Sequence, residues 1–225
     1  MSVGDIFYSE QELEYQRDAR GFFEIEASRF IRAMEEKNEY PFDMLKKMGE
    51  RKYIGVRFPA KYGGGDLDMI HECIINHEAG AQSYALACAR SVPHHCGYIL
   101  YKYGSEDQKS RYLPSIFAGT TIVAEAITEP TVGSDAVRMK TRAVREGEYY
   151  LINGEKRFQA SGAVAELLIV FAITDPNVHP RKGMSCFVVE RSKEDIVALE
   201  EFKTMGWKGL RVVSELILNN VKVAK

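Results

Sequence analysis

The feature that most constrains this chain is a change in the spacing of its apolar residues near Thr120. Upstream, apolar side chains recur every three or four positions, as at Phe23, Ala27 and Phe30, which predicts helices with one buried face. Downstream, short runs rich in β-branched and aromatic residues alternate with turn residues, which is typical of strands. We therefore expect an α+β chain, with an all-α helical domain over residues 1–120 and an antiparallel β-barrel or sandwich domain over residues 121–225.

Two capping boxes predict where helices begin in the first half. They are SEQE at Ser9–Glu12 and SEDQ at Ser105–Gln108, each with a serine followed three residues later by a Glu or Gln. Between them, KYGGGDLD at Lys61–Asp68 carries too much glycine to stay helical and predicts a loop. The mostly apolar stretch from Met69 to about Ala89 then predicts either one buried helix or a helical pair.

Six short runs predict the strands of the second half: TIVAEAI, EYYLI, KRFQA, ELLIVFAI, MSCFVVE and SELILNNVKV. Asn153-Gly154 separates EYYLI from KRFQA, and this dipeptide strongly favours a two-residue hairpin turn. We therefore expect a hairpin at that point.

Composition excludes several classes of protein. The formal net charge of the 225 residues is -2, and Lys and Arg are scattered among Asp and Glu, so we expect no nucleic-acid partner. No apolar run approaches the ~20 residues that span a bilayer, and the first residues lack the basic and apolar segments of a secretory signal. We therefore expect a cytoplasmic protein without a membrane span.

Neither cysteine nor histidine spacing predicts a metal site. The four cysteines match no zinc or redox motif, so we expect reduced and mostly buried thiols. His94-His95-Cys96 invites a metal interpretation, but three adjacent ligands on one short turn cannot easily close a tetrahedral site. A packed or capping role is therefore favoured for these residues.

The stretch ITEPTVGSD at Ile127–Asp135 follows a predicted strand and carries unusual chemistry. One interpretation is an anion-binding nest, because Gly133 allows positive φ, and Ser134 and Thr128 add hydroxyl donors. The other is an ordinary turn in which the Ser and Asp side chains cap local backbone groups. From the residues alone both stay open.

Several motifs in order resemble the acyl-CoA dehydrogenase family: LKKMGERKYIGVRFPAKYGGGDLD, YGSEDQKSRYLPSIFAGTTIVAEAITEP, AEAITEPTVGSD, YYLINGEKRFQASG and MGWKG. Members of that family bind FAD and oxidise an acyl-CoA thioester to its 2,3-enoyl form. They contain a helical, a β and a second helical domain. The resemblance runs from about Ser9 to Val223, so it covers only the first two.

The resemblance implies which residues bind the cofactor. Main-chain groups around Ala126 and Ile127, with the Thr128 hydroxyl, would meet the pyrimidine edge of the flavin, and Ser134 would reach both the FAD pyrophosphate and the CoA of the substrate. Phe158 and its neighbours would pack near flavin N5, where an aromatic ring buries well against another ring. The complete cofactor-binding set is Glu125, Ala126, Ile127, Thr128, Gly133, Ser134, Phe158, Gln159 and Ala160.

No catalytic residue is assigned. In the family the glutamate that removes the α-proton comes from the C-terminal helical domain, so we expect it from a missing domain or a partner chain. Neither Glu125 nor Glu129 is expected to be that base, and Glu129 is instead expected to accept backbone N–H bonds around its loop. Trp207 would either border the acyl-CoA entrance or lie in the core.

Three residues depart from the family pattern. Ala160 stands where family members commonly have a Thr or Ser whose hydroxyl donates a hydrogen bond to flavin N5. Val132 and Arg138 stand where many members have a small residue. Ser161 or a backbone N–H would have to replace the lost bond.

The implied function is FAD-dependent α,β-dehydrogenation, with electrons passing to an electron-transfer flavoprotein. Three alternatives stay open for the chain itself: a truncated enzyme, one subunit of a split dehydrogenase, and a non-catalytic FAD- or acyl-CoA-binding module. We also expect a homo- or hetero-oligomer, because a chain without the last helical domain would expose apolar surface.

Overall fold

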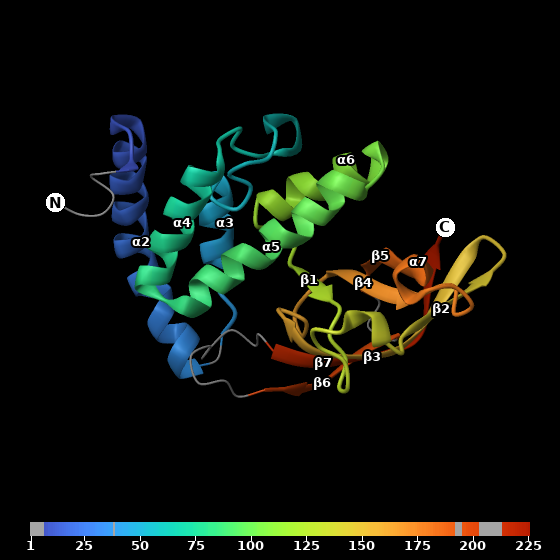
Figure 1. Ribbon diagram of the computed structural model, residues 1–225. Coiled ribbons are helices and arrows are strands. Elements are labelled where there is room, and N and C mark those ends of the chain that lie inside the picture. The colour runs from blue at the N-terminus through green and yellow to red at the C-terminus, as the bar shows by residue number, and fades with distance from the viewer. Residues whose placement is uncertain (1–6, 38, 192–194, 203–212) are drawn as a thin grey trace. The chain divides into compact units, whose positions relative to one another are not determined.

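The structure is a computed structural model that describes residues 7–37, 39–191, 195–202 and 213–225. These residues fall into two compact units that divide between Thr120 and Thr121 (Figure 1). Helices make up the first unit and a curled sheet the second, so the predicted fold class, helical domain followed by β-domain, is confirmed.

The helical unit contains α2 (Glu10–Lys37), α3 (Phe42–Glu50), the 3₁₀ turn η1 (Ala60–Tyr62), α4 (Met69–Gln82), α5 (Tyr84–Tyr103) and α6 (Glu106–Phe117). Helix α4 packs between α2 and α5, and α6 packs on α5 (Figure 1). The apolar faces meet in a core that includes Phe23, Leu45 and Ile74. The stretch from Met69 is therefore a helical pair.

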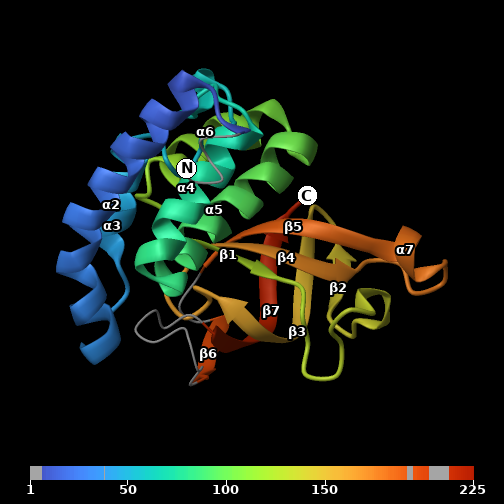
Figure 2. The same cartoon turned by 60° about the vertical axis from the view of Figure 1, so that its left-hand side comes forward.

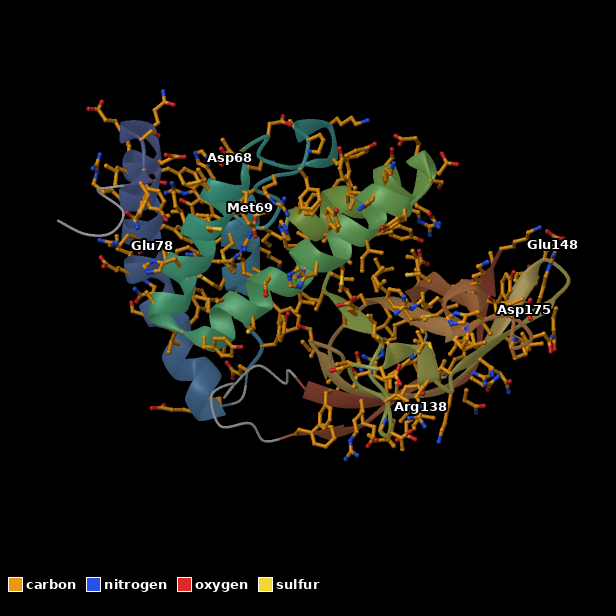
Figure 3. All side chains as sticks on the ribbon, in the orientation of Figure 1. Asp68, Met69, Glu78, Arg138, Glu148 and Asp175 are labelled. Carbon is orange, nitrogen blue, oxygen red and sulfur yellow. The ribbon has the colours of Figure 1, made fainter. Side chains whose placement is uncertain are left out.

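The predicted helix starts are formed. Ser9 and Glu12 exchange backbone-to-side-chain bonds before α2, and Ser105 and Gln108 form a capping box before α6. A third cap begins α4, where the Asp68 side chain accepts from the amides of Ile70 and His71 (Figure 3). Each cap satisfies amides that have no partner within their own helix.

The β unit is one seven-stranded sheet. Its elements are β1 (Val123–Ala126), η2 (Ala136–Arg138), β2 (Arg142–Glu146), β3 (Tyr149–Ala160), β4 (Leu167–Ile173), α7 (Pro180–Gly183), β5 (Met184–Glu190), β6 (Ile196–Glu201) and β7 (Val213–Ala224). The strand order is β1-β4-β2-β3-β7-β6, and β5 also pairs with β4. Figure 2 shows that the sheet curls, with β4 and β5 running across β3 and β7.

The sheet is mixed, which corrects the expectation of an antiparallel one. Strand β1 pairs with β4 in parallel, from Val123 opposite Leu167 to Ala126 opposite Val170, and β2 meets β4 in parallel at Arg142 and Ile173. Parallel pairing normally requires strands covered on both faces, and the nearly continuous apolar run of β4 meets this need.

The predicted hairpin at Asn153-Gly154 is wrong. Strand β3 runs straight through it and pairs with β2 on one side and β7 on the other, with a register shift between Ile152 and Gly154. Gly154 takes a φ of 158°, and the Asn153 side chain bonds Asn220 instead of closing a turn. The hairpin forms earlier, at Gly147-Glu148, where Gly147 has a φ of 63° (Figure 3).

The cysteines are all free, as expected, but they are not mostly buried. Cys96 is buried and Cys88 is half-buried, whereas Cys73 and Cys186 are exposed. Among the described residues, no helix combines the length and the apolar character that a bilayer span requires.

Candidate functional site

The loop after β1 is built around a tight turn. Glu129 and Val132 exchange two backbone hydrogen bonds of 2.9 and 3.1 Å across Pro130-Thr131. The φ of Gly133 lies outside the left-handed region, and a Cβ built there would meet no atom within 4 Å. The backbone at Gly133 therefore does not support the interpretation of this loop as an anion-binding nest, which relied on a positive φ at that residue. Within the described chain, the amides of Gly133 and Ser134 nevertheless donate to no backbone carbonyl.

A buried ion pair fixes this loop. Glu129 is 4% exposed, and its carboxylate accepts from the amides of Lys140 at 2.5 Å and Thr141 at 2.9 Å, which confirms the structural role expected for it. Lys156 from β3 is fully buried and donates to Glu129 Oε1 and to the carbonyl of Ile127, both at 3.0 Å. One lysine thus holds both the start and the middle of the loop.

The environment keeps Glu129 ionised. Burial opposes the charged form, but donors from Thr141 and Lys140 and the charge of Lys156 outweigh it and lower the pKa of the carboxyl. Burial lowers the pKa of Lys156, and the neighbouring Glu129 opposes that change.

The end of β3 carries a strained and exposed aromatic residue. Phe158 has a φ of 61° and is 56% exposed, and it lies at a register shift between Lys156 and Gln159. A left-handed φ costs a non-glycine residue roughly 1–2 kcal/mol. Such strain persists where the surroundings fix the backbone, and it gathers at binding and catalytic sites.

Thr128 joins the loop to this strand. Its carbonyl accepts from the Arg157 amide at 2.7 Å and from Gln159 Nε2 at 3.0 Å. Gln159 is 3% exposed and also donates to the Arg157 carbonyl, so its amide lies inside the structure. The loop that carries Thr128 and the strand that carries Phe158 are therefore held side by side.

The structure brings together some of the predicted site residues. Thr128, Gln159 and the adjacent Phe158 and Ala160 form one group. Ala126 is fully buried in β1, Glu125 beside it is half-buried, and the Ile127 carbonyl faces Lys156. Gly133 and Ser134 follow the tight turn in sequence and are exposed.

Two functional candidates were missed in the sequence: Lys156 and Arg157. Lys156 follows the buried Ile152 by an even number of positions in β3, and this spacing places it on the inward face. A lysine on the inward face needs an acidic partner, so this spacing could have indicated a buried ion pair at Lys156. The position of Arg157 was not predictable, because the bulge beside it overrides the alternation.

Arg157 lies against two aromatic rings. Its guanidinium carbon is 5.3 Å from the Phe158 ring centre and 4.9 Å from that of Phe202, and the two rings are 4.9 Å apart. Arg157 Nε is buried and has no hydrogen-bond partner among the described residues. The exposed Phe158 ring, with a cationic guanidinium beside it, offers an aromatic surface for a planar ligand.

The other residues singled out in the sequence lie in the core, on the surface or outside the described residues. Val132 packs with Met139 and Ile173, and Arg138 is exposed in η2 (Figure 3). Ser161 is buried with a φ of 62°. Trp207 lies outside the described residues.

The His94 region has the packed role that was expected. His94 is buried, with Nδ1 3.2 Å from Glu72 and Nε2 3.1 Å from Arg57. Within the described residues, no group of three or more His, Cys, Asp or Glu side chains could hold a metal ion.

Family models match almost the whole chain. The acyl-CoA dehydrogenase N-terminal domain matches residues 9–120, and the acyl-CoA dehydrogenase middle domain matches residues 124–221.

Similar proteins agree with these matches. A Bacillus subtilis acyl-CoA dehydrogenase is 33% identical over 96% of this chain and 56% of its own length. The caffeyl-CoA reductase-Etf complex subunit CarC of Acetobacterium woodii is 33% identical over 98% of this chain and 58% of its own. Among solved structures, acyl-CoA dehydrogenase from Geobacillus kaustophilus has a TM-score of 0.87 at 29% identity, covering 97% of this chain and 57% of that one. The chain thus spans about half the length of the curated relatives it matches.

Proposed function

Because the chain belongs to the acyl-CoA dehydrogenase family, we propose that it binds FAD and an acyl-CoA thioester and takes part in α,β-dehydrogenation of that thioester. FAD supplies the acceptor for the hydride that leaves the β-carbon. The carboxylate that removes the α-proton would come from protein beyond these 225 residues, in the same polypeptide or in a partner chain. The role of this chain is to hold and orient the two ligands.

The observation that carries the proposal is the strained, exposed Phe158 fixed beside the Thr128 loop. We propose that the flavin packs against Phe158, with the Thr128 hydroxyl and main-chain groups of Ala126 and Ile127 at its pyrimidine edge. Support comes from a relative's solved structure, a glutaryl-CoA dehydrogenase from Mycobacterium smegmatis in complex with FADH2, with a TM-score of 0.88 at 27% identity.

The other site residues have proposed roles of two kinds. Ser134 is exposed, and its amide and that of Gly133 donate to no backbone carbonyl among the described residues, so Ser134 would reach the FAD pyrophosphate and the CoA. Gln159 and Glu129 would act indirectly, because their polar atoms hold the loop. Glu125 and Gly133 would line the same cofactor surface.

Ala160 favours a second candidate, a module that binds FAD or acyl-CoA without redox activity. Alanine has no hydroxyl that could donate a hydrogen bond to flavin N5, and losing one hydrogen bond costs about 0.5–1.5 kcal/mol. This change weakens hydride acceptance more directly than it weakens FAD binding. Reductases among the relatives, such as the caffeyl-CoA reductase-Etf complex subunit CarC, support an electron-transfer flavoprotein as the redox partner.

The absorbance spectrum of the purified chain with added FAD tests the proposal. We expect the flavin bands to shift and the flavin to stay with the protein through gel filtration. Adding acyl-CoAs of several chain lengths then separates the candidates, because bleaching supports dehydrogenation by this chain alone. A yellow protein that does not bleach supports a subunit that needs its base, and a colourless protein that binds CoA supports the module. A chain that binds neither ligand contradicts both.

A further inference from the structure

Arg157 stands out because the bulge in β3 gives it an unusual position. Consecutive side chains on a regular strand point to opposite faces, but a bulge with a left-handed residue breaks the alternation. As a result Arg157 and Phe158 lie on the same side, with the guanidinium 5.3 Å from the Phe158 ring centre. Lys156 lies on the other side, fully buried against Glu129.

The positive charge of Arg157 is only partly balanced. Its nearest acid among the described residues is Glu215, with Nε and Oε1 3.8 Å apart, which is beyond hydrogen-bonding distance. Glu215 is also the main reason that the pKa of the Glu155 carboxyl is raised, because a second carboxylate nearby disfavours the charged form. The Arg157 side chain is 33% exposed, so water screens its charge less than that of a surface arginine.

A cation in this position has a clear effect on a ring bound at Phe158. Hydride transfer adds two electrons and one proton to the flavin, so the neutral oxidised ring becomes an anion. A nearby positive charge stabilises that anion relative to the oxidised form and raises the reduction potential.

We propose that Arg157 is an electrostatic residue that makes the flavin bound beside Phe158 easier to reduce, and that Glu215 moderates this effect. The inference rests on the proposed function, because it requires FAD at Phe158. It goes beyond it by naming the residues that set the redox balance of the site. The two residues should act with opposite sign.

The test is a reductive titration of the FAD-loaded chain with dithionite, in the presence of a redox dye of similar potential. At a fixed ratio of reduced to oxidised dye, Arg157→Met should lower the ratio of reduced to oxidised flavin about tenfold. This corresponds to a fall of about 30 mV in the reduction potential of a two-electron couple. Glu215→Gln should raise the ratio, and Arg157→Lys, which keeps the charge, should stay within about threefold of wild type.

Arg145→Met is the matched control. Arg145 is exposed in β2 and donates to the Gly147 carbonyl. It pairs with Tyr150, eight residues before Phe158, so it lies roughly 25 Å along the strand from the proposed site. Its loss should leave the flavin ratio unchanged.

The outcomes separate the inference from the function. If the wild-type chain binds no FAD, the proposed function fails and the inference fails with it. If FAD binds but Arg157→Met titrates like Arg145→Met, only the inference is overturned. If Arg157→Met no longer holds FAD, Glu215→Gln decides, and an unchanged or lower ratio in that variant overturns the proposal.

Discussion

At the residue scale, each unit of this protein contains charged groups in its interior. In the helical unit the fully buried Arg90 lies 2.6 Å from Glu72, and in the β unit Lys156 is paired with Glu129. Buried charges need partners because leaving water is costly, and removing one partner is worse than removing both. These pairs therefore fix local geometry rather than adding much net stability.

Breaking the pair in the β unit should be strongly destabilising. Lys156→Met leaves the buried Glu129 carboxylate without its cation, so we expect the free energy of unfolding to fall by about 3–5 kcal/mol in urea titrations. The double variant Lys156→Met/Glu129→Gln should lose less than the two single losses added together. Lys222→Met, at an exposed lysine over the Tyr149 ring, should cost less than about 1 kcal/mol. Equal losses at the two lysines would contradict this prediction.

His94 should make the stability depend on pH. Burial, with the charges of Arg90 and Arg57, lowers the pKa of His94 from 6.5 to about 3. Between those values the unfolded chain takes up a proton that the folded chain resists, so stability is lost as the pH falls below 6.5. The loss is at most about 1.4 kcal/mol per pH unit.

Urea unfolding at pH 7 and pH 5 measures this effect. The difference in unfolding free energy between the two values should shrink by about 1–2 kcal/mol in His94→Gln. His95→Gln, at the exposed neighbour on α5, should show the wild-type difference. If His94→Gln shows the same difference in unfolding free energy between pH 7 and pH 5 as the wild type, His94 does not cause the pH dependence.

At the element scale, most elements were predicted from the sequence, but β3 was wrongly predicted as two strands joined by a hairpin turn. The capping boxes, the glycine-rich loop and the strand runs depend on neighbouring residues, so they could be recognised locally. Asn153-Gly154 has strong turn propensity, yet pairing on both edges keeps β3 extended there. The pairing of β3 with β2 and β7 therefore decided that Asn153-Gly154 lies at a bulge rather than in a turn.

Close packing at Gly154 explains why that bulge needs glycine. A Cβ there would lie 2.4 Å from Thr141 Oγ1 and 2.8 Å from Thr141 Cα, and the φ of 158° adds strain. Gly154→Ala should therefore lower the free energy of unfolding by roughly 1–3 kcal/mol, by the mechanism of overpacking. Gly133→Ala, where the added carbon meets nothing, should change it by less than about 0.5 kcal/mol. Thermal denaturation of both variants provides the comparison.

The second bulge can be tested by comparing two truncations of Phe158. Because φ is 61°, Phe158→Gly should be more stable than Phe158→Ala by about 1 kcal/mol. At Val144, an exposed site in the regular strand β2, the order should reverse, with alanine more stable than glycine. Chemical denaturation of the four variants measures both orders. Alanine being more stable at both positions would show that the Phe158 backbone is not strained.

At the scale of the whole molecule, the two units differ in how far apart in sequence the elements that pack or pair with one another lie. In the helical unit α4 packs against both α2 and α5, whereas the sheet joins β1 to β4 and β3 to β7 across long separations in sequence. All the residues proposed to contact FAD lie in the β unit. Ligand binding should therefore be detected mainly there.

Hydrogen exchange with and without FAD tests this division. At a hundredfold excess of FAD over its dissociation constant, we expect a gain of about 2.7 kcal/mol in stability. Protection should be concentrated in peptides spanning residues 125–134 and 156–160, while peptides from α2 and α4 change little. Uniform protection of both units would argue against a site confined to the β unit.

The sequence by itself determined the order of helical and β units, the helix caps and the family, because these depend on local spacing and on short motifs. Through the family resemblance it also indicated Thr128 and Phe158 as candidate site residues, and it indicated Glu129 as a structural carboxylate. Only the tertiary structure decided that the sheet is mixed, that β3 passes through Asn153-Gly154, and that Lys156 pairs with Glu129. These features depend on which distant backbone and side-chain groups become partners once water is excluded, and no local pattern specifies those partners.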